Sequence, residues 1–122
     1  MSRTKFIFHK GKRILFIDFS RLSADEAIQH IDEAEAIIAR QPKGSILCLM
    51  DVTEASYSKA VIKKMKEFTK HNEPYIHTSA AVGVQGLMKF LFDAILSFSG
   101  RTNLVLKTDM EDAKDWLVAQ PL

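Results

Sequence analysis

Cysteine is almost absent from this sequence, because Cys48 is the single one among 122 residues. One cysteine cannot form a disulfide within the chain, and it cannot complete a thiolate metal site. Cys48 lies in the apolar run SILCLM, where a buried and unreactive thiol is expected. This cysteine usage is typical of a reducing compartment, so we predict a cytoplasmic protein.

Long apolar runs and a strong charge of one sign are missing as well. The first residues, MSRTKFIFHKGKR, lack the unbroken apolar stretch of a signal peptide. No run approaches the roughly 20 apolar residues that span a bilayer. The net charge is only +2 at pH 7, so overall attraction to nucleic acid is weak. We therefore expect neither an integral membrane protein nor a nucleic-acid-binding protein.

Motifs for metal binding, phosphate binding and catalysis are also lacking. No two of the four histidines have the i, i+4 spacing of a helical zinc pair. Gly83 and Gly86, in VGVQGL, lack both the third glycine of a dinucleotide fingerprint and the lysine of a P-loop. They predict a tight turn from a strand into a helix. We expect a protein without metal, other cofactors or enzymatic activity.

The sequence does contain a regular alternation of strand-like and helix-like segments. Its length indicates one domain, residues 1–122. Apolar runs predict strands at 5–9, 13–19, 45–50, 75–84 and 103–107. Apolar spacings of three and four predict helices at 24–40, 58–71 and 87–99, and a last one from Thr108. This order, ββαβαβαβα, predicts an α/β fold with a mostly parallel sheet, an N-terminal antiparallel hairpin and helices packed on the sheet.

Several residues mark the expected helix ends. Ser23 and Glu26 have the spacing of a capping box, and Thr108 and Glu111 repeat it before the last helix. Gly100 stands where a glycine commonly ends a helix, after the third helical segment.

Acidic and hydroxyl side chains gather where the predicted strands end. Because the carboxyl ends of parallel strands share one edge of a sheet, these residues predict a polar crevice there. Asp51 and Lys107 resemble the acidic and basic pair of a phosphoryl-accepting receiver domain. A receiver, however, begins with a parallel strand that ends in two acidic residues, whereas this chain begins with a hairpin that ends in one aspartate. Roles as helix caps and turn residues explain these side chains more simply. The crevice residues are Asp51, Thr53, Glu54, Ser56, Gln85 and Asp109.

The third helical segment is unusually apolar, with nine apolar residues in the twelve of LMKFLFDAILSF. A helix that is apolar nearly all round must be covered on more than one side. The pattern places Leu87, Phe90, Leu91, Ala94, Ile95 and Phe98 on the core side. The remaining stripe is covered by neighbouring helices, by the second subunit of a homodimer or by an apolar ligand, and the sequence leaves these three alternatives open. The stripe consists of Met88, Phe92, Leu96 and Ser99.

The second helical segment carries a basic stripe made of Lys59, Lys63, Lys66 and Lys70. No aromatic residues interleave it and Glu67 interrupts it, so we interpret it as a solvated helix face.

A set of short motifs resembles a known family: Pro74-Tyr75, VGVQGL, Ser99-Gly100-Arg101 and EDAKDWL. From about Phe6 to Val118 the chain is similar to small bacterial SpoIIAA-like proteins. These are relatives of the anti-sigma-factor antagonist (STAS) domain and, more distantly, of the lipid-binding Sec14/CRAL-TRIO domain. The resemblance implies a SpoIIAA-like α/β fold without established catalysis or cofactor.

The sequence departs from phosphorylated antagonists at one place. In those antagonists an Asp-Ser-Ser-Gly-like turn precedes the helix that follows the central strand. Here residues 51–58 read DVTEASYS, so the resemblance predicts no phosphorylation site in this chain. We therefore expect a non-catalytic protein-interaction or regulatory module. The alternative is a carrier or sensor of a small apolar ligand or lipid.

Overall fold

The structure is a computed structural model that describes residues 3–86, 88–99 and 103–121. Its strands and helices alternate as the sequence predicts, which confirms the expected fold class. The elements are β1 (Thr4–His9), β2 (Lys12–Asp18), α1 (Ala24–Ile38), β3 (Ile46–Asp51), α2 (Lys59–Asn72), β4 (Ile76–Val82), α3 (Met88–Ser99), β5 (Leu104–Lys107) and α4 (Met110–Ala119).

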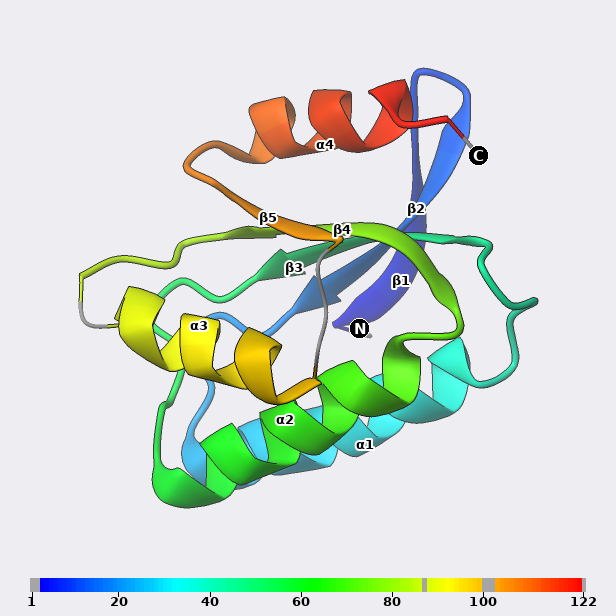
Figure 1. Ribbon diagram of the computed structural model, residues 1–122. Helices are drawn as coiled ribbons and strands as arrows, with labels where there is room; N and C mark the ends of the chain where they lie inside the picture. The colour runs from blue at the N-terminus through cyan, green and yellow to red at the C-terminus, as the bar shows by residue number, and fades with distance from the viewer. Residues whose placement is uncertain (1–2, 87, 100–102, 122) are drawn as a thin grey trace.

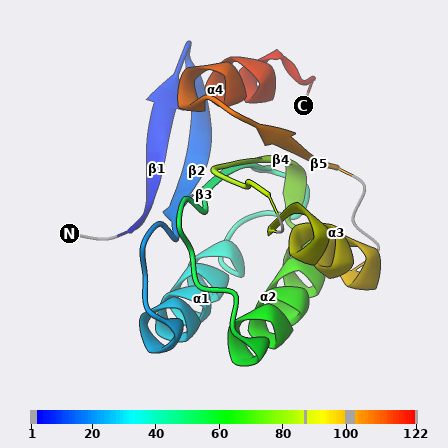
Figure 2. The ribbon, with the colours of Figure 1, turned by 90° about the vertical axis from the view of Figure 1, so that its left-hand side faces the viewer.

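The five strands form one sheet in the order β1-β2-β3-β4-β5. β1 and β2 are antiparallel and the other neighbours are parallel. Each parallel strand lies beside the previous one, so the three crossovers progress in the same direction. With right-handed crossovers, all three connecting helices must then lie on one face of the sheet. Figures 1 and 2 show α1, α2 and α3 on that face and α4 on the opposite one.

β3 lies at the centre of the sheet and is covered on both faces. Cys48 and Met50 belong to the core that α1, α2 and α3 cover. Leu47 and Leu49 belong to the smaller core beneath α4. The nearly continuous apolar run predicts this double burial, because a strand covered on both faces has no polar alternation. Within the described residues, no helix is long and apolar enough to span a membrane.

One of the two predicted capping boxes is present. The Glu26 amide donates to Ser23 Oγ at 3.3 Å, and the Ser23 amide donates to Glu26 Oε1 at 3.0 Å. The box predicted at Thr108 is wrong. α4 starts one residue later, because the Asp109 carboxylate accepts a hydrogen bond from the Asp112 amide at 3.3 Å and caps the helix itself. The predicted cap at Gly100 lies outside the described residues.

The two glycines after β4 turn the chain, as their pattern predicts. Gly83 has φ +89° and Gly86 has φ +59°, both in the left-handed region that favours glycine. At Gly83 a side chain is also excluded by space, because an added Cβ atom would lie 2.6 Å from the Thr53 backbone nitrogen. The turn after β4 therefore packs directly against the turn after β3.

The predicted faces of α3 are wrong in part. Ile95, predicted on the core side, is 1% exposed as expected. Phe92, predicted on the outer stripe, is also 1% exposed, whereas Phe90, predicted on the core side, is 73% exposed. Ala94 is exposed too, and Met88 is half-buried against the core. Because the helix is apolar nearly all round, its spacing alone does not determine which side meets the core. The side chains of Leu96 and Ser99 lie outside the described part of the structure.

Candidate functional site

The carboxyl ends of β2 and β3 carry two matching turns. Asp51 Oδ1 accepts hydrogen bonds from the Thr53 amide at 3.0 Å and from the Thr53 hydroxyl at 2.7 Å. Asp18 Oδ1 accepts in the same way from the amide and hydroxyl of Ser20, at 2.9 and 2.5 Å. Asp18 and Asp51 are partners in the parallel register. One oxygen of each carboxylate therefore stabilises a local turn.

The other predicted crevice residues do not form one cluster, although Glu54 lies at these two turns. Glu54 is exposed and accepts a hydrogen bond from Arg21 Nε at 2.9 Å. Gln85 is exposed, and Asp109 caps α4 on the opposite face of the sheet. Lys107 Nζ lies 5.9 Å from the centroid of the Trp116 ring, on the α4 side. Of the predicted set, Ser56 alone reaches the cavity described next.

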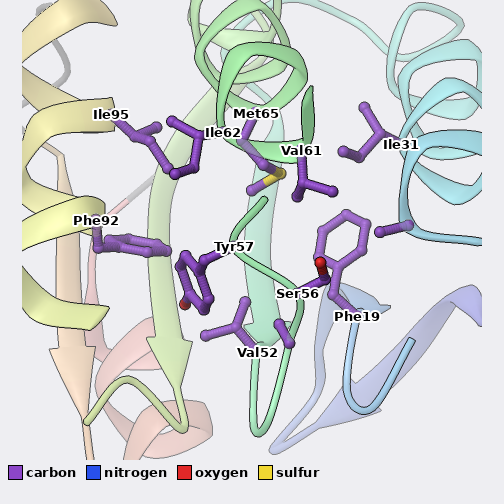
Figure 3. Close-up of a pocket in the computed structure, with 12 residues that line it drawn as sticks. Phe19, Ile31, Val52, Ser56, Tyr57, Val61, Ile62, Met65, Phe92 and Ile95 are labelled. Carbon is purple, nitrogen blue, oxygen red and sulfur yellow. The ribbon is translucent and has the colours of Figure 1, made fainter. Parts of the chain in front are cut away.

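A small apolar cavity of about 30 Å³ lies beside these turns. The loop from β3 to α2 covers it at the carboxyl end of the sheet, and α1, α2 and α3 form its walls (Figure 3). Its residues come from five separate parts of the chain, and nearly all are apolar: Phe19, Ala27, Ile31, Val52, Ala55, Ser56, Tyr57, Val61, Ile62, Met65, Phe92 and Ile95.

The covering loop is anchored at both ends. The Val52 amide donates to the Val82 carbonyl at 2.9 Å, which continues the sheet by one residue. At the other end Ser58 Oγ accepts from the Val61 amide at 3.3 Å and caps α2. Between these anchors lies Tyr57, whose ring Figure 3 shows in the cavity near Phe92.

The hydroxyl of Tyr57 is buried and has no hydrogen-bond partner among the described residues. Burial raises the pKa of Tyr57, because the apolar surroundings disfavour the phenolate. Leaving such a hydroxyl without a partner costs about 1–3 kcal/mol relative to exposing it to water. The loop therefore holds the Tyr57 hydroxyl in apolar surroundings where no described residue forms a hydrogen bond with it.

In the opposite wall, Phe19 packs against two other rings. Phe19 packs edge-on against His30, with ring centroids 5.3 Å apart, and against Phe68 at 6.0 Å. His30 is itself buried, and its Nε2 lies 3.2 Å from Thr4 Oγ1. Phe19 is thus held by neighbours on two sides, whereas Tyr57 belongs to a loop.

The sequence interpretation missed Tyr57 and Phe19. A signal for Tyr57 exists, because TEASYS places one aromatic residue in an otherwise polar or small loop between a strand and a helix. No local signal reveals Phe19, which follows β2 directly and reads as part of a strand. In the described part of the chain, no group of three or more His, Cys, Asp or Glu side chains is placed to hold a metal ion.

Comparison with known proteins supports the architecture. No protein-family model matches the chain, and no curated protein matches its sequence. Among solved structures, it is similar to an uncharacterised DUF3478-family protein from Shewanella loihica that has a SpoIIAA-like fold. The two share 18% identity over 93% of this chain and 91% of the other, with a TM-score of 0.71. This chain has a SpoIIAA-like fold.

The SpoIIAA-like fold agrees with the family resemblance of the short motifs. At 18% identity the comparison shows that the strands and helices are arranged alike, but it gives no information about the side chains that line the cavity. Because one fold can serve many functions, this likeness assigns a fold and no activity to the chain.

Proposed function

We propose that this SpoIIAA-like chain is a non-catalytic binding module that takes a small apolar ligand in the cavity behind Tyr57. The observation that carries the proposal is the Tyr57 hydroxyl, which is buried in an apolar cavity without a partner among the described residues. Binding pockets are mostly apolar with a few polar groups that fix the orientation of a ligand, and this cavity has that character.

The cavity holds about 30 Å³, which is close to the volume of one water molecule. A ligand therefore needs the Tyr57 ring to move aside. Moving it outward gives its hydroxyl access to water, while the ligand takes the place of the ring near Phe92. Only molecules in which the Tyr57 ring has left the cavity can bind, so the apparent affinity equals the intrinsic affinity multiplied by the fraction of such molecules.

The test is a titration with decan-1-ol, followed by the methyl NMR signals of Ile62 and Ile95. Tyr57→Ala removes the ring and is expected to tighten binding. Tyr57→Phe keeps the ring and removes the hydroxyl, which has no partner among the described residues. It is expected to stabilise the state with the ring in the cavity and so to weaken binding. Tyr75→Phe, at the other tyrosine, is the matched control. No shift of these signals in either the wild type or Tyr57→Ala would contradict the proposal.

A second candidate is a protein-interaction module, with self-association into a homodimer as its simplest form. The observation in its favour is Phe90, a large apolar side chain that is 73% exposed on α3. The proposed contact is centred on Phe90 and not on the originally predicted stripe, because Phe92 is buried inside the molecule. The buried thiol of Cys48 supports the accompanying proposal of a cytoplasmic location.

A further inference from the structure

We propose that the ligand is an amphiphile with a single carboxylate head, which lies against lysines of α2 while its apolar chain enters the cavity. This inference rests on the proposed function and specifies the ligand class of the same cavity. The structural basis is a second feature of α2, a surface groove beside the cavity.

The groove is shallow and open to solvent, with a volume of about 440 Å³, and is lined by Lys59, Ile62, Lys63, Lys66 and Glu67. Ile62 is half-buried and lines both the groove and the cavity. One side chain therefore separates an apolar space from a basic surface. A ligand that passes Ile62 would have its apolar part among Val61, Met65 and Phe92 and its head on the lysine side.

The charge of the groove favours an anion. It carries three lysines and one glutamate, so its formal charge is +2. Lys64, which points toward α1, is engaged differently, because its Nζ lies 2.6 Å from Asp32 Oδ1. Lys63 and Glu67 also line a groove on the α1 side, together with Lys64, so the positive charge extends over both sides of this part of α2.

The first turn of α2 adds to the preference of the groove for an anion. α1 and α4 both have acidic residues in their first turn, which compensate the positive end of the helix dipole. α2 and α3 have none there, and α2 begins with Lys59. The groove thus combines a helix N-terminus, a lysine at that terminus and a second lysine one turn later, Lys63, each of which attracts a negative head group.

The experiment compares three probes with the same ten-carbon chain, decanoate, decan-1-ol and decylammonium, each below its micelle concentration. Isothermal titration at low salt measures binding to the wild type and to Tyr57→Ala. We expect decanoate to bind on the order of tenfold more tightly than decan-1-ol, and decylammonium to bind most weakly. The advantage of decanoate is expected to shrink as salt is raised.

The variants Lys59→Gln and Lys63→Gln are expected to remove most of the advantage of decanoate and to leave decan-1-ol binding unchanged. Lys43→Gln, at an exposed lysine of the α1–β3 loop, is the control that should change neither. Equal affinity for decanoate and decan-1-ol, or a ratio unaffected by both groove variants, overturns this inference but not the proposed function. Absence of binding by all three probes, in Tyr57→Ala as well, overturns both.

Discussion

Gly83 lies so close to Thr53 that a Cβ atom added at Gly83 would stand 2.3 Å from the Thr53 hydroxyl oxygen. This contact joins the turn after β4 to the turn after β3, at the edge of the sheet where the covering loop begins. Glycine is therefore required at position 83 for two reasons: its φ is positive, and Thr53 leaves no room for a side chain.

Replacement of Gly83 by alanine is expected to lower the free energy of unfolding by at least about 2 kcal/mol, since it combines backbone strain with a steric clash. Gly86→Ala is the matched control. Gly86 also has a positive φ, but an added Cβ atom would meet nothing within 4 Å, so about 1 kcal/mol is expected. Urea unfolding measures both values, and equal losses would show that the contact with Thr53 is unimportant.

Tyr57→Phe is expected to raise the free energy of unfolding by about 1 kcal/mol, because it removes a buried hydroxyl that lacks a partner in the described structure. Tyr75→Phe should change it little. A loss of stability in Tyr57→Phe would mean that the hydroxyl makes a favourable interaction.

The same tyrosine predicts a dependence on alkaline pH. The pKa of Tyr57 is raised in the folded state above the ordinary value of 10.0, so the unfolded chain loses its proton first. The stability associated with the neutral phenol is complete below pH 10 and is lost as the pH rises from there through the folded pKa. Compared with Tyr57→Phe, the wild type should therefore become less stable above pH 10, as measured by unfolding at pH 9 and 11.

Asp115→Asn tests how the hairpin is attached to α4. Asp115 Oδ1 lies 2.7 Å from His9 Nε2 and 2.9 Å from Lys10 Nζ, at the tip of the β1–β2 hairpin. The hydrogen bond with His9, followed by that with Lys10, holds the pKa of Asp115 below its ordinary value of 3.8. The stabilisation is present above that value and is lost as the pH falls through the folded pKa.

The variant Asp115→Asn should accordingly be less stable than the wild type at pH 7, with a difference that shrinks below pH 3.8. Asp93→Asn, at an exposed aspartate of α3, serves as the control for removal of a surface charge. A difference between Asp115→Asn and the wild type that is constant from pH 7 to pH 2 would contradict the role given to the carboxylate.

Phe90→Asp tests the second candidate function. If the surface around Phe90 forms a homodimer, sedimentation equilibrium at tens of micromolar should show a dimer for the wild type and a monomer for the variant. Phe8→Asp is a matched control, because Phe8 is 76% exposed on β1 and its replacement adds the same charge. A wild-type monomer, or dissociation caused by Phe8→Asp instead, would reject the proposed contact.

Local sequence determines most of the architecture of this protein. Ser23 and Glu26 satisfy each other's backbone amides within a few residues, so their spacing alone predicts the start of α1. The apolar run that contains Cys48 likewise predicts a strand covered on both faces. The strict alternation of strands and helices then leaves few topologies, because crossovers are right-handed and neighbouring elements tend to pack together.

The tertiary structure alone decides which side of α3 faces the core, and hence that Phe92 is buried and Phe90 exposed. A helix that is apolar nearly all round can pack in several orientations, and the surfaces of α2 and the sheet select one of them. The cavity has the same origin, because its walls come from segments as distant as Phe19 and Ile95. Periodicity describes one segment at a time, whereas a cavity depends on how several segments pack together. The burial of the Tyr57 hydroxyl away from any partner in the described structure therefore arises only in the folded chain.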